Sequence, residues 1–138
     1  MIEIDGSRLE GGGQIMRTTA AISVATGRAC RIFNIRKHRP KPGLATQHLL
    51  GLQALARLCG ERLEGGAPGS MDIRFIPGPI KGGELTVRIP TAGSVTLVLQ
   101  LLLLPALFAD KPVTVVFEGG ATDTFYAPTS DHFRFVFP

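Results

Sequence analysis

Residues 9–17 read Leu-Glu-Gly-Gly-Gly-Gln-Ile-Met-Arg, a glycine triplet that opens a segment with helical periodicity. Gln14–Thr26 is predicted to be a helix that ends at Gly27, because glycine readily adopts the left-handed conformation that closes helices. Its core-facing side is expected to contain Ile15, Ile22 and Ala25. Ile2–Ile4 before the triplet and Ala29–Ile35 after the helix have strand-like patterns, so the chain is predicted to begin with a β-α-β unit.

A second helix and two strands are predicted to complete this unit. Thr46–Cys59 carries apolar residues at helical spacing and is followed by Gly60. Glu61–Glu64 and Met71–Ile76 have strand patterns around a turn rich in glycine and proline. Residues 1–80 are therefore predicted to follow the order β-α-β-α-β-β.

The same order is predicted to start again after residue 80. Glu84–Ile89 is expected to be a strand, Val95 to about Phe108 an apolar helix, and Val113–Phe117 another strand. A helix start is expected at Ser130 or Asp131, but the residues that follow are too few to bury an apolar stripe. The predicted fold class is α/β (α+β), with about one and a half repeated units, at 1–80 and 81–138.

Composition and charge narrow the function. The chain has 138 residues, 44% of them hydrophobic, which is typical of a globular domain and excludes wholesale disorder. Residues 1–50 hold eight Lys/Arg and three Asp/Glu, a net charge of +5, whereas residues 51–138 carry −1. This asymmetry indicates either a phosphate-bearing partner or a solvated basic face. The chain has no Trp and one Tyr, so it is poorly supplied for a base-stacking platform.

Cysteine usage and hydropathy indicate a cytoplasmic protein with no membrane partner. Cys30 and Cys59 lack zinc-ligand spacing and are expected to be buried thiols in a reducing compartment. The most apolar stretch, Val95–Ala109, is shorter than the roughly 20 residues that a transmembrane helix needs. Glu3 and Asp5 interrupt any apolar run at the start, so no signal peptide is expected.

Two strings are candidates for binding an anion. Backbone N–H groups of Gly11–Gly13 could approach an anion at a helix N-terminus, with Arg17 one turn later and Glu10 placed to hold a divalent cation. A tight turn without ligand is the alternative. The loop 34–44 holds four cations and two prolines between a strand and a helix, which would preorganise Arg36 and Arg39 for phosphate contacts; a solvated connection is again the alternative.

Three further polar residues stand out. Gln47 and His48 begin the second helix and are expected to face the same site, where a histidine is more often a capping or packed residue than a catalyst. Gln100 is the one long polar side chain between Val95 and Ala109 and is expected to be buried, as a satisfied core amide or as a reader of a nucleobase edge.

These strings occur in a fixed order: Asp5-Gly6, Glu10–Arg17, Asn34–Leu44 with Gln47-His48, Thr91–Ser94 with Gln100, and Gly120–Asp131. In this order and spacing the chain resembles the RNA 3'-terminal phosphate cyclases over all 138 residues. The resemblance implies repeated units similar to the C-terminal domain of translation initiation factor 3. It also implies ATP-dependent conversion of an RNA 3'-phosphate to a 2',3'-cyclic phosphate. In that family a histidine is adenylylated, AMP passes to the RNA phosphate, and the 2'-hydroxyl then expels AMP.

The resemblance also implies roles for individual residues. Glu10 matches a glutamate that contacts Mg²⁺ or Mn²⁺, and Gln100 matches a glutamine near the adenine of ATP. The phosphate-contacting residues of the family are matched by Arg17, Arg36, Arg39 and Gln47. No catalytic nucleophile is expected here, because the family's histidine lies beyond this chain, and His38, His48 and His132 do not match its motif.

The chain departs from the family in length, since family members are more than twice as long, and Gly119–Asp123 has one residue more than the usual form. We therefore expect an N-terminal portion, a truncated reading frame or one subunit of a split enzyme. A homo-oligomer or a partner chain is expected to cover the exposed face.

The sequence leaves two other functions open. A non-catalytic RNA-binding protein, like the family's ribosome-assembly relatives, would bind RNA without regard to its 3' end or to ATP. An enolpyruvyl-transferase-like enzyme shares the repeat architecture and also grips anions with arginines, but Gly11–Gly13 and Arg36–Leu44 do not look like that family's strings.

Overall fold

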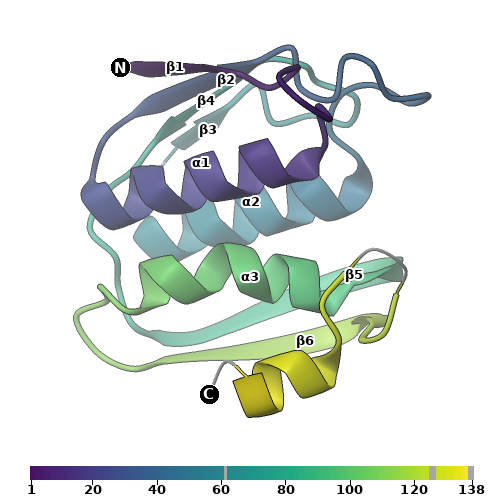
Figure 1. The fold of residues 1–138 in the computed structure, drawn as a ribbon. Helices are drawn as coiled ribbons and strands as arrows, with labels where there is room; N and C mark the ends of the chain where they lie inside the picture. Colours follow the sequence, from purple (N-terminus) through teal and green to yellow (C-terminus); the bar gives the residue numbers. More distant parts are fainter. Residues whose placement is uncertain (61, 125–126, 137–138) are drawn as a thin grey trace.

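Three helices lie between two sheets in the computed structural model, which describes residues 1–60, 62–124 and 127–136 (Figure 1). The four-stranded sheet has the order β1-β2-β4-β3, with β1 and β2 parallel and the other two pairs antiparallel. Its strands are β1 (Ile2–Asp5), β2 (Cys30–Phe33), β3 (Arg62–Glu64) and β4 (Ile73–Ile76). Helices α1 (Gly13–Thr26) and α2 (Thr46–Cys59) cover one face of this sheet. The order β-α-β-α-β-β predicted for residues 1–80 is confirmed, although Glu61 lies outside the described residues.

A second β-α-β unit follows. Strands β5 (Gly83–Ser94) and β6 (Val113–Ala121) pair in parallel, and α3 (Val95–Ala106) connects them. The helix packs against both α1 and α2, so the helices of the two units meet in the middle of the molecule (Figure 1). A short π-helical turn, η1 (His132–Val136), comes last among the described elements. The strand, helix and strand predicted after residue 80 are thus present, and the chain has the mixed α/β architecture that was expected.

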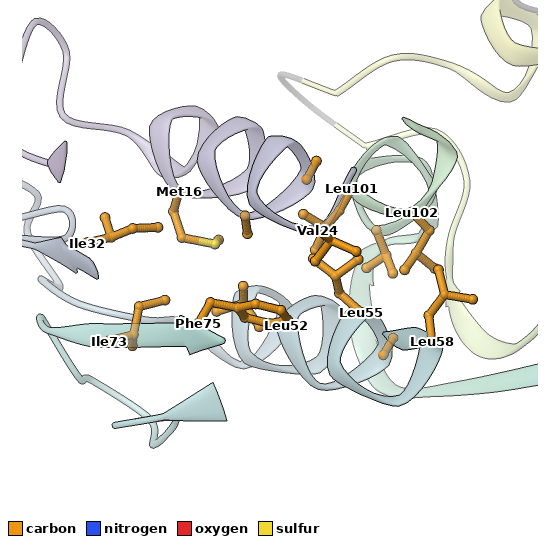
Figure 2. Packing of buried hydrophobic residues seen from close by; sticks show 14 of the residues in the cluster. Met16, Val24, Ile32, Leu52, Leu55, Leu58, Ile73, Phe75, Leu101 and Leu102 are labelled. Atoms are coloured by element: carbon orange, nitrogen blue, oxygen red, sulfur yellow. The ribbon is translucent and has the colours of Figure 1, made fainter. Parts of the chain in front are cut away.

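The core is continuous across these layers. Phe75 of β4, Leu52 and Leu55 of α2 and Leu101 of α3 are all fully buried, and Figure 2 shows them in one cluster with Met16 of α1. Burying a side chain of this size stabilises the fold by roughly 1.5–3 kcal/mol. A single core therefore joins the β-α-β-α-β-β unit to the β-α-β unit and fixes how their helices pack.

The predicted apolar face of α1 is wrong. The helix buries Met16, Ala20 and Val24, whereas Ile22 is 48% exposed. The buried residues are spaced by four and include a small residue, which lets α1 approach both the sheet and α3 closely. The sequence analysis predicted a different face, and packing against two layers buries Met16, Ala20 and Val24 instead.

Helix termination follows the sequence. Gly27 and Gly60 close α1 and α2 in the left-handed conformation, with φ of 68° and 63°. Cys30 and Cys59 are buried free thiols, as expected. In the part of the chain that the structure describes, no helix has the length and hydrophobicity required to cross a membrane.

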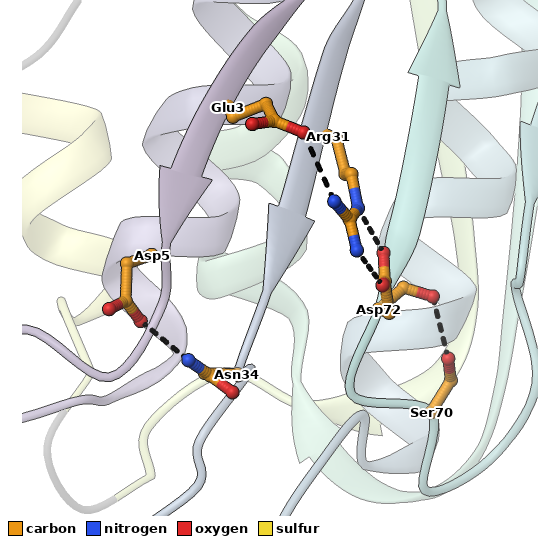
Figure 3. A network of polar contacts seen from close by, with 6 residues as sticks. All are labelled: Glu3, Asp5, Arg31, Asn34, Ser70 and Asp72. Carbon is orange, nitrogen blue, oxygen red and sulfur yellow. Dashed lines mark hydrogen bonds and ion pairs between the residues drawn. The ribbon is translucent and has the colours of Figure 1, made fainter.

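The basic run from Arg28 to Lys41 does not form one patch. Arg31 lies on the outer face of the four-stranded sheet, where its guanidinium pairs with Glu3 at 3.0 Å and with Asp72 at 2.6 Å (Figure 3). The paired guanidinium lowers the pKa of the Asp72 carboxyl. Arg31 is thus engaged in ion pairs, whereas the cations from Arg36 to Lys41 lie in the loop after β2.

Candidate anion-binding site

The N-termini of α1, α2 and α3 lie at the same end of the molecule (Figure 1). Gly13 at the start of α1 faces His48 in the first turn of α2, and Gln47 beside it reaches Ser94, which caps α3. Among the described residues, none in the first turns of these helices is acidic. Each helix N-terminus carries about half a positive charge and free N–H groups, so three of them together favour an anion strongly.

The glycine triplet leaves room for two cationic side chains. A Cβ on Gly12 would lie 2.9 Å from Nη2 of Arg39, and a Cβ on Gly13 would lie 2.9 Å from Nη1 of Arg17. Gly11, with φ of 58°, turns the chain into the helix. The structure therefore brings Arg17 and Arg39 to the glycine backbone.

The loop of residues 34–44, here called the arginine loop, contains two residues with a strained backbone. Asn34 and Arg36 have φ of 53° and 51°, in the left-handed region that costs a non-glycine residue about 1 kcal/mol or more. The Gly43 N–H donates to the Ile35 carbonyl at 2.9 Å and closes the loop at its base. Nη1 of Arg36 donates to the Gly43 carbonyl at 2.8 Å, which holds the guanidinium inside the loop. From the same loop, the Arg39 guanidinium reaches Gly12 at the start of α1.

Arg17 is the most unusual cation of this group. Its Nη2 donates to Oε1 of Gln14 at 3.2 Å, but within the described residues its buried Nε has no hydrogen-bond partner. Burial lowers the pKa of the Arg17 guanidinium, and burial together with the charge of Arg39 lowers that of Arg36. A bound anion would raise the pKa of both guanidiniums, because it would supply a negative charge and a hydrogen-bond acceptor.

His48 was expected to face this site, as a capping or packed residue more often than as a catalyst. It does cap α2: Nδ1 accepts from the Ala45 N–H at 3.1 Å. Burial, and then the charges of Arg36 and Arg17, lower its pKa to about 4, so the imidazole is neutral at pH 7. The lone pair of Nδ1 is engaged and Nε2 carries the proton, which leaves no free lone pair for a nucleophile.

Gln47 has a structural contact that the sequence did not predict. Its Oε1 accepts from the Ser94 N–H at 3.2 Å and so connects the start of α2 to the start of α3. The amide –NH₂ group of Gln47 remains to donate elsewhere. The side chain is therefore placed at the site, with one end bound to the second unit.

Glu10 could hold a metal ion only together with a bound phosphate that supplies further metal ligands. Glu10 is exposed in the turn before the triplet. The described residues contain no group of three His, Cys, Asp or Glu side chains that could hold a metal ion. Mg²⁺ is commonly bound by one or two carboxylates together with substrate phosphates, and the donor set here fits that pattern rather than an all-protein cage.

Gln100 is exposed rather than buried, so that expectation is wrong. The stretch 95–109 is apolar all round, but α1, α2 and the β5–β6 sheet cover only part of α3. Gln100 lies on the uncovered side and lines a cavity of about 320 Å³ between α3 and the segment that contains Pro128 and Phe133. That volume is within the range of small-molecule sites.

Several known proteins, all with the same name, are similar in sequence to this chain. A family model described as RNA 3'-terminal phosphate cyclase matches residues 8–138. A protein of that name from Archaeoglobus fulgidus is 54% identical over 136 residues, 99% of this chain and 41% of the relative. The Methanosarcina barkeri protein is 50% identical over 99% of this chain and 41% of its own length, and the Pyrococcus furiosus protein 51% over 96% and 38%. The chain thus spans about two fifths of the length of these relatives, and it belongs to the RNA 3'-terminal phosphate cyclase family.

Proposed function

We propose that the chain forms the phosphate- and nucleotide-binding part of an ATP-dependent RNA 3'-terminal phosphate cyclase, a ligase that acts in RNA processing. The observation that carries the proposal is the meeting of three helix N-termini, with Arg17 and Arg39 beside the glycine triplet and Arg36 held in the loop that contains Arg39. Phosphoryl and nucleotidyl transfer depend on holding negative charge still, and this is the group of donors that such a reaction needs.

The phosphate contacts are divided among several residues. We assign phosphate oxygens of ATP or of the RNA 3' end to Arg17, Arg36, Arg39 and the free amide end of Gln47. Mg²⁺ or Mn²⁺, held by Glu10 and by those phosphates, would neutralise charge on the phosphate oxygens. We assign no nucleophile to residues 1–138, and the adenylylated histidine of the family mechanism has no counterpart here.

The base of ATP is assigned to the cavity beside Gln100. Leu104, Pro128 and Phe133 supply apolar walls, and the Gln100 amide can both donate and accept at the edge of a purine. The two buried free thiols accord with a reducing compartment, so we place the protein in the cytoplasm.

The test is selective loss of the 3'-phosphate contact. Arg39→Ala is expected to weaken binding of a 3'-phosphorylated oligoribonucleotide about tenfold or more, and of its 3'-hydroxyl counterpart far less, because a charged contact to phosphate is lost. Arg28→Ala, which removes an exposed cation next to β2 and outside the arginine loop, is the control and should affect both RNAs equally. Equal loss on both RNAs with Arg39→Ala would contradict the proposal.

A second measurement separates this function from a non-catalytic RNA-binding protein. The intact mass of the chain after incubation with ATP and Mg²⁺ is expected to be unchanged, while ATP competes with 3'-phosphorylated RNA for binding. A nucleotidyl adduct would place a nucleophile within residues 1–138 and contradict the assignment above. Tight, salt-dependent RNA binding that ignores both ATP and the 3' end would favour the ribosome-assembly type of function instead.

A further inference from the structure

We propose that His48 is itself an anion-contacting residue, whose Nε2–H donates to a phosphate oxygen while its Nδ1 caps α2. The inference rests on the proposed function, since the anion is the phosphate of that site. It adds a neutral donor to the arginine set, at a residue for which the sequence assigned no contact to the anion.

The cap fixes which nitrogen carries the proton. Only 7% of His48 is exposed, and its Nδ1 accepts a hydrogen bond from the Ala45 N–H at 3.1 Å. A nitrogen that accepts a backbone N–H has no proton of its own, so the neutral ring must carry its proton on Nε2. The lowered pKa, caused first by burial and then by Arg36 and Arg17, keeps the ring in this neutral form.

The Nε2 atom lies against the start of α1. A Cβ on Gly13 would lie 2.5 Å from Nε2 and 2.9 Å from Nη1 of Arg17, so these two donors lie close to each other beside the backbone of Gly13. The buried Nε of Arg17 has no partner among the described residues. Donors from His48, Arg17 and the start of α1 thus lie close together, and one acceptor that carries negative charge would satisfy them.

Two substitutions separate the cap from the anion contact. Asn can place an acceptor near the position of Nδ1 but has no donor at Nε2, whereas Gln can place an –NH₂ near Nε2 but cannot cap from Nδ1. The probe is inorganic tripolyphosphate, with the dissociation constant measured by calorimetry and stability by thermal unfolding. His48→Asn is expected to keep the unfolding temperature and to weaken tripolyphosphate binding about tenfold.

His48→Gln is expected to behave in the opposite way, with a lower unfolding temperature and binding within about threefold of the wild type. If both substitutions lower stability alike and leave tripolyphosphate affinity unchanged, His48 is only a cap and the inference is overturned. Arg39→Ala distinguishes this failure from that of the proposed function. When Arg39→Ala weakens binding and His48→Asn does not, only the role of His48 fails; when neither does, the phosphate site itself fails.

A measurement on the unaltered chain covers the case in which a variant does not fold. The ¹⁵N and ¹H resonances of the His48 ring report protonation and hydrogen bonding of each nitrogen. Adding tripolyphosphate at constant ionic strength is expected to shift the Nε2–H proton downfield and leave Nδ1 unprotonated. An unmoved Nε2–H resonance at saturating tripolyphosphate would overturn the contact.

Discussion

Burial makes His48 a source of acid sensitivity. Its pKa is lowered to about 4 from an ordinary 6.5, so between these values the unfolded chain takes up a proton that the folded chain does not. The free energy of unfolding therefore falls as the pH drops through this window, by up to roughly 3 kcal/mol below pH 4. His48→Asn should remove this dependence, and the difference between the two proteins in urea unfolding at pH 7, 5 and 4 measures it. Parallel stability curves would contradict the assignment, since carboxylates such as Asp72 contribute equally to both.

Gly13 and Gly12 offer a matched pair of alanine substitutions. A Cβ on Gly13 meets the buried ring of His48 at 2.5 Å, whereas a Cβ on Gly12 meets only the end of the exposed Arg39 side chain at 2.9 Å. That end can move away, but the ring cannot. Gly13→Ala is expected to weaken tripolyphosphate binding at least tenfold and Gly12→Ala less than threefold, measured by calorimetry. Equal affinities for the two variants would show that the space at Gly13 is not part of the site.

At the level of elements, the sequence predicted most where a local rule operates. Gly27 and Gly60 ended their helices where expected, and Thr46–Cys59 was predicted with the bounds that α2 has. The predictions for the buried face of α1 and for Gln100 were wrong, because both depend on which sides of a helix are covered by other layers. No local pattern carries that information. The contact of Gln47 with Ser94, 47 residues apart, was invisible for the same reason.

Gln47 connects two elements, and a substitution can separate its two ends. Gln47→Glu keeps an oxygen acceptor for the Ser94 N–H but replaces the free –NH₂ donor with a negatively charged oxygen. We expect stability to change by less than about 1 kcal/mol and binding of 3'-phosphorylated RNA to weaken more than tenfold, from electrostatic repulsion. Thermal unfolding and fluorescence anisotropy measure the two effects. Unchanged RNA affinity would mean that Gln47 serves only to join α2 and α3.

Ser94, which Gln47 contacts, also caps α3 with its own side chain. The Ser94 hydroxyl accepts from the Leu97 N–H at 3.2 Å and bonds Thr96 at 2.9 Å, both at the start of the helix. Ser94→Ala should lower the free energy of unfolding by about 1 kcal/mol, the usual cost of losing such a cap. Ser94→Thr, which keeps the hydroxyl, is the control in the same urea titration. An alanine variant as stable as the wild type would show that the start of α3 is held by packing and by Gln47 alone.

On the scale of the whole molecule, an apolar surface is left at the end of α3. Leu107 is 78% exposed and its neighbour Phe108 60%, and Phe135 of η1 is 66% exposed. Large apolar side chains exposed next to each other often mark an interface. We therefore expect association with a second copy or a partner chain, and light scattering of the purified chain should give a mass above its 14.7 kDa. Leu107→Asp should lower that mass, whereas Leu9→Asp, at a fully exposed position in the turn before α1, should not. A stable, monodisperse monomer would show that this surface needs no partner in solution.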